Sequence, residues 1–278
     1  MVCVNIAAVN GIRFSPAGLR VNSSMTRGIL IFAIISALIY VGLCIGLFIS
    51  QRSLIYYPQP SSTPADAATL TLTVDQARIL ISTRPHPGPD AVIYFGGNAE
   101  DVTRSLPTLQ EAFPNRALYA LHYRSYGGST GKPSEAALTA DALALFDRVH
   151  ADHPHIVVIG RSLGSGVAIH LASVRPAERL VLVSPYDSLL KLAADQFPFL
   201  PVRWLLIDKF ESWRYAAHVT APTLLIAAEH DEVIPRASTE ALYRRFRSSL
   251  ATLQVVRTAD HNSISESPQY VPLLSGTP

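Results

Sequence analysis

Residues 156–166, IVVIGRSLGSG, decide the fold. An apolar, β-branched run leads directly into Gly160, and small residues continue after Ser162 into a stretch of helical composition. The pattern G-x-S-x-G between a strand and a helix is typical of a sharp turn that exposes a serine hydroxyl, because small residues let the two backbones approach closely. The stretch therefore predicts a strand, a nucleophile at Ser162 and a helix over residues 163–174.

The same pattern occurs a second time, as GGSTG around Ser129. RSYGG precedes this serine, and Lys132-Pro133 follows it, where the residue before proline is disfavoured in a helix. The stretch GSTGKP also fails as a phosphate-binding loop, since Tyr126 stands in place of the first glycine and Pro133 in place of the final Ser or Thr. We predict that Ser129 is a loop serine.

Short apolar or β-branched runs alternate with segments of helical length in the rest of the chain. The predicted strands are TLTLTV, ARILIST, AVIYFGG, ALYALHY, IVVIG, RLVLVSP, TLLIAAE and ATLQVV, and further helices are predicted over residues 134–150 and 236–247. This alternation indicates an α/β fold, with a mostly parallel sheet covered by helices on both faces. The first two strands lack a helix-length connection and are expected to form an antiparallel hairpin. Residues 187–220 interrupt the alternation and are predicted to be an insertion.

A nucleophilic serine requires a base, and the base requires a carboxylate that orients it. TLLIAAEHDEVIP places Asp231 just past one predicted strand, and ATLQVVRTADHNSI places His261 just past the next. Glu229 and Glu232 are competing acids, but Asp231 directly precedes an apolar segment and is preferred. The alternative for Asp231 is a carboxylate that caps a helix.

The remaining histidines are assigned no catalytic role. His150, His153 and His155 surround Pro154 in a polar loop without regular spacing, so they are predicted to be solvated rather than zinc ligands. His170 lies in the predicted helix over residues 163–174 and is expected to be buried against the sheet. Both cysteines, Cys3 and Cys44, are near the N-terminus. No metal or cofactor is implied.

Two backbone N–H groups are needed to stabilise a tetrahedral oxyanion. The first is expected from Leu163, the residue after the nucleophile. The second is expected from Asn98, because AVIYFGGNAED places it in the loop after the third strand, where Gly96 and Gly97 let the backbone turn its amides inward. A plain glycine turn remains the alternative.

Residues 28–50, GILIFAIISALIYVGLCIGLFIS, form an uncharged apolar run long enough to cross a hydrocarbon core of about 30 Å. The run exceeds the apolar region of a usual signal peptide, so we predict an uncleaved membrane anchor. The expected organisation is a cytoplasmic segment over residues 1–27, the anchor, a tether over residues 51–66 and a catalytic domain over residues 67–278.

Arginines indicate the orientation of the anchor. Arg13, Arg20 and Arg27 precede the span and only Arg52 closely follows it, so the N-terminus is expected in the cytoplasm and the catalytic domain outside it. Translation from Met1 or from Met25 preserves a basic flank. The net charge of +2 and the lack of a long basic run argue against a nucleic-acid partner.

The chain resembles the membrane-anchored α/β-hydrolases of the serine-aminopeptidase-like superfamily. The resemblance rests on QRSLIYYP, FGGNAED, YRSYGGSTGKPSE, GRSLGSGVA, SPYDSL, FPFLPVRWLL, HDEVIP and DHNSI, and covers residues 28 to about 265. It implies triad roles for Ser162, Asp231 and His261. It implies oxyanion roles for Asn98 and Leu163.

Two positions depart from the family pattern. Gly96 replaces a histidine before Gly-Asn, which is expected to loosen substrate positioning. Ser125 replaces a glycine, which is expected to be tolerated only if Ser125 avoids positive φ.

The expected function is hydrolysis of acyl esters or thioesters, with lipid-like substrates, by a membrane-anchored serine hydrolase. A serine peptidase, an acyltransferase and a catalytically silent binding protein remain alternatives. Apolar residues of the insertion are expected to form either a lid close to the membrane or part of the core; they are Phe197, Phe199, Trp204, Leu205, Leu206 and Trp213.

Overall fold

A computed structural model of the protein describes residues 23–62 and 69–276. The chain comprises two compact units, Met1–Gly46 and Leu47–Pro278. The predictions that concern Met1, Cys3, Arg13 and Arg20, and the end of the tether, lie outside the described residues.

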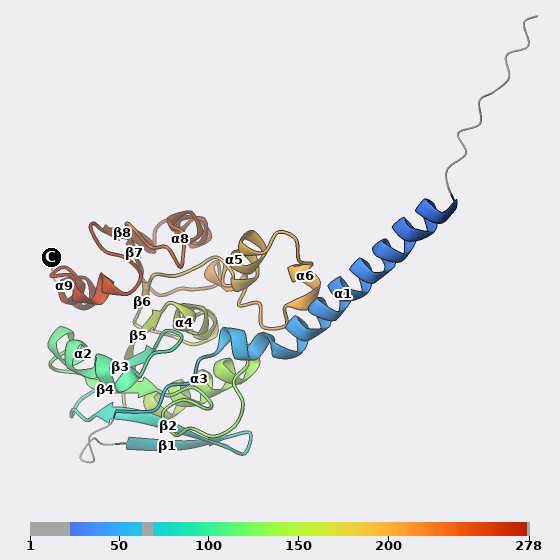
Figure 1. Ribbon diagram of the computed structural model, residues 1–278. Helices are drawn as coiled ribbons and strands as arrows, with labels where there is room; N and C mark the ends of the chain where they lie inside the picture. The colour runs from blue at the N-terminus through green and yellow to red at the C-terminus, as the bar shows by residue number, and fades with distance from the viewer. Residues whose placement is uncertain (1–22, 63–68, 277–278) are drawn as a thin grey trace, which may run out of the picture. The chain divides into compact units, whose positions relative to one another are not determined.

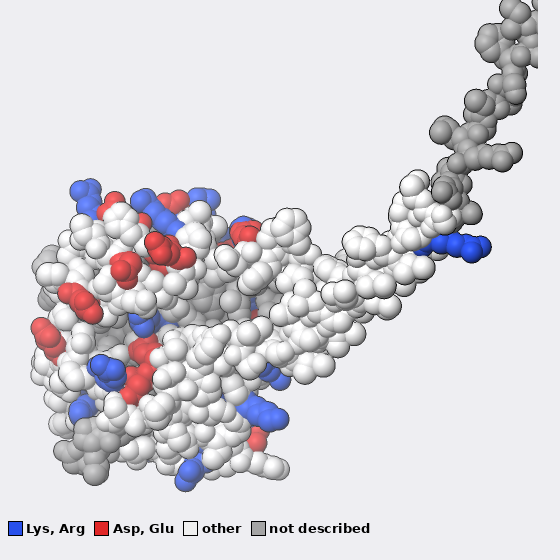
Figure 2. All heavy atoms as spheres, viewed as in Figure 1, with Lys and Arg blue, Asp and Glu red and all other residues white. Residues whose placement is uncertain are grey.

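The predicted anchor is helical throughout. Helix α1 (Ser23–Ile55) covers residues 28–50 and extends beyond them at both ends, so residues 51–55 of the expected tether are helical. In the described residues it is the one helix long and apolar enough to cross a membrane. The space-filling view shows it white along most of its length, which reflects the lack of charged side chains between Arg27 and Arg52 (Figure 2). The helix suggests membrane anchoring.

Within the described residues, eight strands form one sheet with the order β1-β2-β4-β3-β5-β6-β7-β8. They are β1 (Thr69–Val74), β2 (Ala77–Arg84), β3 (Asp90–Phe95), β4 (Ala117–Leu121), β5 (His155–Arg161), β6 (Arg179–Val183), β7 (Thr223–Ala228) and β8 (Ala251–Val256). All the predicted strands form, and the predicted hairpin of β1 and β2 is confirmed. The β2–β4 pair is also antiparallel, whereas the other pairs are parallel.

Helices cover both faces of the sheet (Figure 1). One face packs against α2 (Leu106–Ala112) and α9 (Tyr270–Ser275), and the other against α3 (Glu135–His150), α4 (Leu163–Val174) and α8 (Arg236–Tyr243). Short 3-10 turns, η1 (Val102–Ser105) and η2 (Ser263–Glu266), precede α2 and α9. The sheet and its helices confirm the predicted α/β-hydrolase fold.

One helix is shorter than predicted. A helix is expected over residues 236–247, but α8 ends at Tyr243. The amides of Arg245 and Phe246 there donate to carbonyls only three residues back, at 2.9 and 3.2 Å. Phe246 is buried in this tighter turn.

The insertion between β6 and β7 contains α5 (Leu189–Gln196), α6 (Val202–Leu205) and α7 (Trp213–Ala216). Phe197, Phe199 and Trp204 are exposed, so these side chains are not part of the core. Leu205, Leu206 and Trp213 are half-buried. Because the insertion follows the carboxyl end of β6, it lies at the edge of the sheet from which the nucleophile loop also emerges.

Candidate active site

Ser162 lies on the sharp turn between β5 and α4 that the sequence predicts. Its backbone has φ 49° and ψ −117°, a strained conformation for a residue with a side chain. The Ser162 amide donates to the carbonyl of Val183 on β6 at 2.9 Å, which fixes the turn to the neighbouring strand. The turn thus carries the Ser162 hydroxyl beyond the edge of the sheet.

Glycines on both sides make this turn possible. A β-carbon on Gly160 would lie 2.5 Å from the carbonyl oxygen of Gly164, and one on Gly164 would lie 2.2 Å from the carbonyl oxygen of Phe95. Both distances are far below van der Waals contact. Only hydrogen fits at these positions, so α4 can begin directly against β3 and β5.

The structure brings Ser162, His261 and Asp231 together in one line of hydrogen bonds. His261 Nε2 lies 3.0 Å from Ser162 Oγ, and His261 Nδ1 lies 2.9 Å from Asp231 Oδ2 and 3.0 Å from Oδ1. The His261 side chain is 11% exposed and the Asp231 side chain 3% exposed. If Nδ1 carries the proton and donates to Asp231, Nε2 is free to accept the proton of Ser162.

The Asp231 carboxylate is held in its charged form. Burial raises its pKa, but hydrogen bonds from His261 and from the Ile234 amide outweigh burial, so the pKa lies below its usual range. Oδ1 accepts from the amides of Val233 and Ile234 at 3.0 and 2.7 Å. The competing Glu229 instead faces His230 and the Thr258 amide.

The loop after β3 lies beside Ser162. A β-carbon on Gly97 would be 3.4 Å from the β-carbon of Ser162. Among the described residues, neither the Asn98 amide nor the Leu163 amide donates to a protein acceptor. Both amides therefore have their N–H groups available close to the turn.

The Asn98 side chain is anchored by the segment that follows α1. Its Oδ1 accepts from the Tyr57 amide at 3.0 Å, from the Tyr126 hydroxyl at 2.8 Å and from the Ala99 amide at 2.9 Å. The Tyr126 hydroxyl also accepts from the Tyr57 amide at 2.9 Å. The residues just past the apolar helix thus hold the loop beside Ser162.

A largely buried ion pair that sequence analysis missed links this loop to His261. Arg161 Nη1 donates to Glu100 Oε2 at 3.0 Å, and its Nη2 donates to the His261 carbonyl at 3.1 Å. Glu100 also accepts from the Gly97 amide at 2.6 Å and from the Tyr94 hydroxyl at 2.6 Å. The signal in the sequence is a charged residue beside each predicted site loop, in GRSLG and in GGNAED.

Replacing Glu100 by glutamine should lower the free energy of unfolding by about 3 kcal/mol at pH 7, because Arg161 loses its buried partner. Burial raises the pKa of Glu100, but Arg161 and hydrogen bonds from Tyr94 and Gly97 outweigh it and lower the pKa. The stabilisation is therefore present above the ordinary glutamate pKa of 4.5 and is lost as pH falls through the lower folded-state value.

Denaturant unfolding of the detergent-solubilised chain at pH 7 and at about pH 3 measures this difference. Glu111→Gln, on an exposed carboxylate, is the control and should change nothing at either pH. An equal difference between wild type and Glu100→Gln at both pH values would contradict the ion-pair explanation.

Ser129 has a structural position. It is buried, and its hydroxyl donates to the His122 carbonyl at 2.9 Å and accepts from the Leu80 amide at 2.8 Å. A second Ser–His contact, from Ser82 Oγ to His122 Nε2 at 2.8 Å, is buried where β2 pairs with the end of β4. Both hydroxyls thus bond to other groups of the β2–β4 region, apart from Asp231 and His261.

Three sequence-based expectations about histidines are wrong. His153 is buried rather than solvated, since Nδ1 contacts the Gly88 carbonyl at 2.8 Å and Nε2 contacts the Tyr119 hydroxyl at 3.1 Å. His150 ends α3 and stacks on Phe146. His170 is only half-buried and stacks on Tyr215 of the insertion rather than on the sheet. Tyr119 and Tyr215, which local sequence does not reveal, come from other segments and account for His153 and His170, whereas Phe146 lies one turn before His150 in α3 itself.

The expectation that Ser125 is tolerated only if it avoids positive φ is also wrong. Its φ is 71°, in the left-handed region that favours glycine. The Ser125 hydroxyl donates to the Gly131 carbonyl at 2.7 Å and its amide donates to the Ser129 carbonyl at 3.1 Å. These local bonds offset the backbone strain.

At Gly96, a β-carbon would lie 2.6 Å from Val102 Cγ1, so a histidine there would displace Val102.

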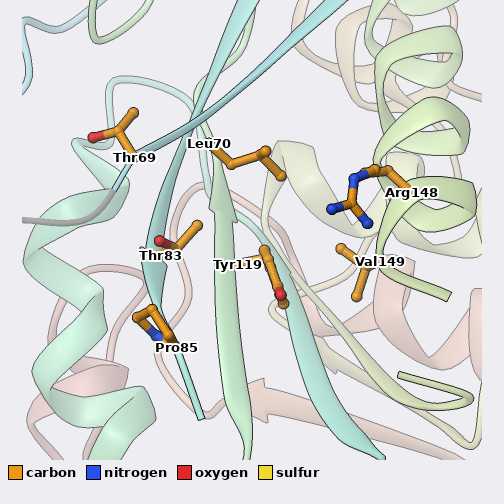
Figure 3. A pocket seen from close by; sticks show the side chains of 7 residues that line it. All are labelled: Thr69, Leu70, Thr83, Pro85, Tyr119, Arg148 and Val149. Atoms are coloured by element: carbon orange, nitrogen blue, oxygen red, sulfur yellow. The ribbon is translucent and has the colours of Figure 1, made fainter. Parts of the chain in front are cut away.

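A polar groove of about 570 Å³ borders the site. Its lining includes Asn98, Arg161 and Asn262, each next to or part of a site loop. A second cavity, of about 220 Å³, lies among β1, β2, β4 and the end of α3 and contains none of the site residues (Figure 3). Neither cavity is lined by Ser162, Asp231 or His261 themselves; the groove contains their neighbours Arg161 and Asn262, and the second cavity does not.

Comparison with known proteins identifies the family. A family model described as serine aminopeptidase, S33, matches residues 209–268. The chain is 36% identical over 237 residues to the uncharacterized protein Rv2307c of Mycobacterium tuberculosis, covering 78% of this chain and 82% of that protein. The chain belongs to the serine-aminopeptidase-like α/β-hydrolases. This membership confirms the resemblance seen in the sequence.

Other members and neighbours of this family are more distant. The lysophosphatidylserine lipase ABHD12 of Macaca fascicularis is 33% identical over 179 residues, covering 55% of this chain and 44% of that protein. The Pyrococcus furiosus esterase Pf2001 superposes with a TM-score of 0.61 at 20% identity, covering 77% of this chain and 93% of the esterase. At that identity the likeness shows the fold alone. Family membership and the likeness to the lipase support hydrolase activity.

Proposed function

We propose that the protein is a serine hydrolase that cleaves carboxylic esters or thioesters of lipid-like acyl groups. The observation that carries the proposal is the continuous contact from Ser162 Oγ through the His261 ring to the Asp231 carboxylate. A hydroxyl, an imidazole and a buried carboxylate at these separations can act as nucleophile, base and orienting acid.

The proposed reaction has two stages. Ser162 attacks the substrate carbonyl while His261 takes its proton, and the Leu163 and Asn98 amides donate to the resulting oxyanion. His261 then protonates the leaving alcohol or thiol, which departs and leaves an acyl ester on Ser162. Water, deprotonated by His261, attacks this ester and releases the acid and free Ser162. No other group is needed to balance these steps.

The anchor supports the choice of an acyl substrate. A helix long and apolar enough to cross a membrane leads directly into the segment that holds Asn98, and this connection supports a lipid-like acyl substrate. The basic residues before the span favour a domain outside the cytoplasm, and we propose that orientation.

Product analysis tests the reaction class. Detergent-solubilised protein is given a matched acyl ester, acyl thioester and acyl anilide, with and without an excess of a primary alcohol. We expect free acid from the ester and thioester, with the anilide cleaved at least about 100-fold more slowly. Rapid anilide cleavage would indicate a peptidase, a new ester formed from the added alcohol would indicate an acyltransferase, and no product at all would contradict the proposal.

Replacing Tyr126 by phenylalanine should lower kcat by roughly tenfold and leave KM nearly unchanged, because it removes one of the bonds that position Asn98. Steady-state kinetics with the ester measures both constants. Tyr119→Phe, whose hydroxyl contacts His153 away from the site, is the matched control. An equal change in both variants would contradict the positioning role of Tyr126.

A further inference from the structure

Four apolar side chains of the insertion are exposed on the surface of the unit Leu47–Pro278, called the catalytic unit below. Phe199 is 89% and Trp204 87% exposed, while Phe197 and Ile207 are each about half exposed. These four residues are called the insertion patch below. Large aromatic side chains with this exposure mark a surface that meets an apolar partner.

The segment over residues 205–208, which includes Ile207 of the insertion patch, is bonded to the last turns of α1 within the same unit. The Gln51 side chain donates to the Leu205 carbonyl at 3.1 Å and accepts from the Ile207 amide at 2.7 Å. Arg52 forms an ion pair with Asp208 at 3.0 Å. Because these contacts lie at and just after the carboxyl end of α6, they fix the backbone that carries Trp204 and Ile207 against the end of α1.

This end of the helix is where the apolar run stops. No charged residue occurs from Gly28 to Gln51, and Arg52 is the first charge after the run. Phe48 and Ile49, in the same unit as the insertion patch, are 45% and 77% exposed. A change from apolar side chains to arginine marks the boundary between hydrocarbon and headgroups. The insertion patch is therefore fixed to the chain at that boundary.

The composition of the insertion patch fits the same location. Tryptophan and phenylalanine are favoured at the interface between headgroups and acyl chains. Arg203, next to Trp204, is exposed and can contact lipid phosphates. The acidic Asp208 beside this segment is buried and paired with Arg52, so it does not oppose an anionic surface.

We infer that the insertion patch inserts into the headgroup and acyl-chain boundary of the same bilayer that α1 crosses. The lipid surface is thus a second contact of the catalytic unit with the membrane, separate from the span. This docking does not depend on catalysis at Ser162. It brings the insertion, which follows β6 at the edge of the sheet that carries Ser162, against the lipid surface.

Tryptophan fluorescence tests the inference, because the chain has two tryptophans, Trp204 and Trp213. The full chain with Trp213→Phe is reconstituted into phosphatidylcholine vesicles, with or without bromine atoms near the headgroup end of one acyl chain. Trp204 emission should fall at least about twofold in the brominated vesicles, because bromine quenches an indole at that depth.

Two controls accompany this measurement. The Trp204→Phe chain reports on Trp213, which is half-buried beneath the guanidinium groups of Arg214 and Arg245 and should be quenched little. In the Trp213→Phe chain, adding Phe199→Asp should abolish most of the quenching. Val174→Asp should not, since Val174 is exposed at the far end of α4, toward the opposite edge of the sheet.

Equal quenching of Trp204 and Trp213 would overturn the inference, as would quenching that Phe199→Asp leaves unchanged. Association of two chains through the insertion patch would shield Trp204 equally in both kinds of vesicle, and this outcome would also overturn it.

Discussion

Replacing Ser162 by alanine should lower kcat/KM for an acyl ester by roughly 10⁴-fold or more and leave the stability of the domain nearly unchanged. The alanine lacks the oxygen that forms the acyl-enzyme, so only binding and the oxyanion amides remain to accelerate attack by water. The Ser162 amide still bonds to Val183, and alanine keeps the β-carbon, so the turn is preserved. Ester hydrolysis by purified wild-type and variant protein measures the loss.

Ser129→Ala is the matched control for Ser162→Ala. Both serines lie in G-x-S-x-G patterns, but the Ser129 hydroxyl bridges the His122 carbonyl and the Leu80 amide. Its removal should lower the free energy of unfolding by about 1–2 kcal/mol and leave kcat near the wild-type value. Full activity in Ser162→Ala together with its loss in Ser129→Ala would reverse the assignment of the nucleophile.

Replacing Asp231 by asparagine should lower kcat by about 10⁴-fold, which is the second-largest expected effect. Asparagine is close in size but neutral, and its amide group can donate to Nδ1 of His261. The ring would then carry its proton on Nε2, which could no longer accept the proton of Ser162. The charge that stabilises the protonated ring would also be lost.

Glu232→Gln provides the control for Asp231→Asn, because Glu232 is an adjacent exposed carboxylate that the sequence left as a competing acid. It should keep kcat within about twofold of wild type. Steady-state kinetics of both variants on the same ester decides between the acids. A greater loss in Glu232→Gln than in Asp231→Asn would contradict the assignment.

The turn around Ser162 was predictable because its determinants are local. An apolar strand, small residues at Gly160 and Gly164 and an apolar helix stand next to one another in the chain. Asp231 and His261 were placed by the same rule, since each follows a predicted strand, and parallel strands bring their carboxyl ends to one edge of a sheet. Their spacing to Ser162, 3.0 Å for His261, required the structure.

Other features depend on partners far away in the chain. The Glu100–Arg161 pair joins residues 61 positions apart, and the anchoring of Asn98 by Tyr57 spans 41. Neither contact produces a periodic pattern in the sequence from which it could be predicted. The insertion shows a different limit: Phe199 and Trp204 would look the same in sequence whether they filled a core or faced a membrane, because apolar composition favours both.

The most direct test of the central claim is labelling of the detergent-solubilised full chain with a fluorophosphonate, followed by mass spectrometry of the labelled peptide. An activated serine hydroxyl attacks the phosphorus and displaces fluoride, which leaves a stable phosphonyl ester. The account predicts one adduct, on Ser162, that is absent from Ser162→Ala and present in Ser129→Ala. No adduct on correctly folded wild-type protein, or an adduct on Ser129, would contradict it.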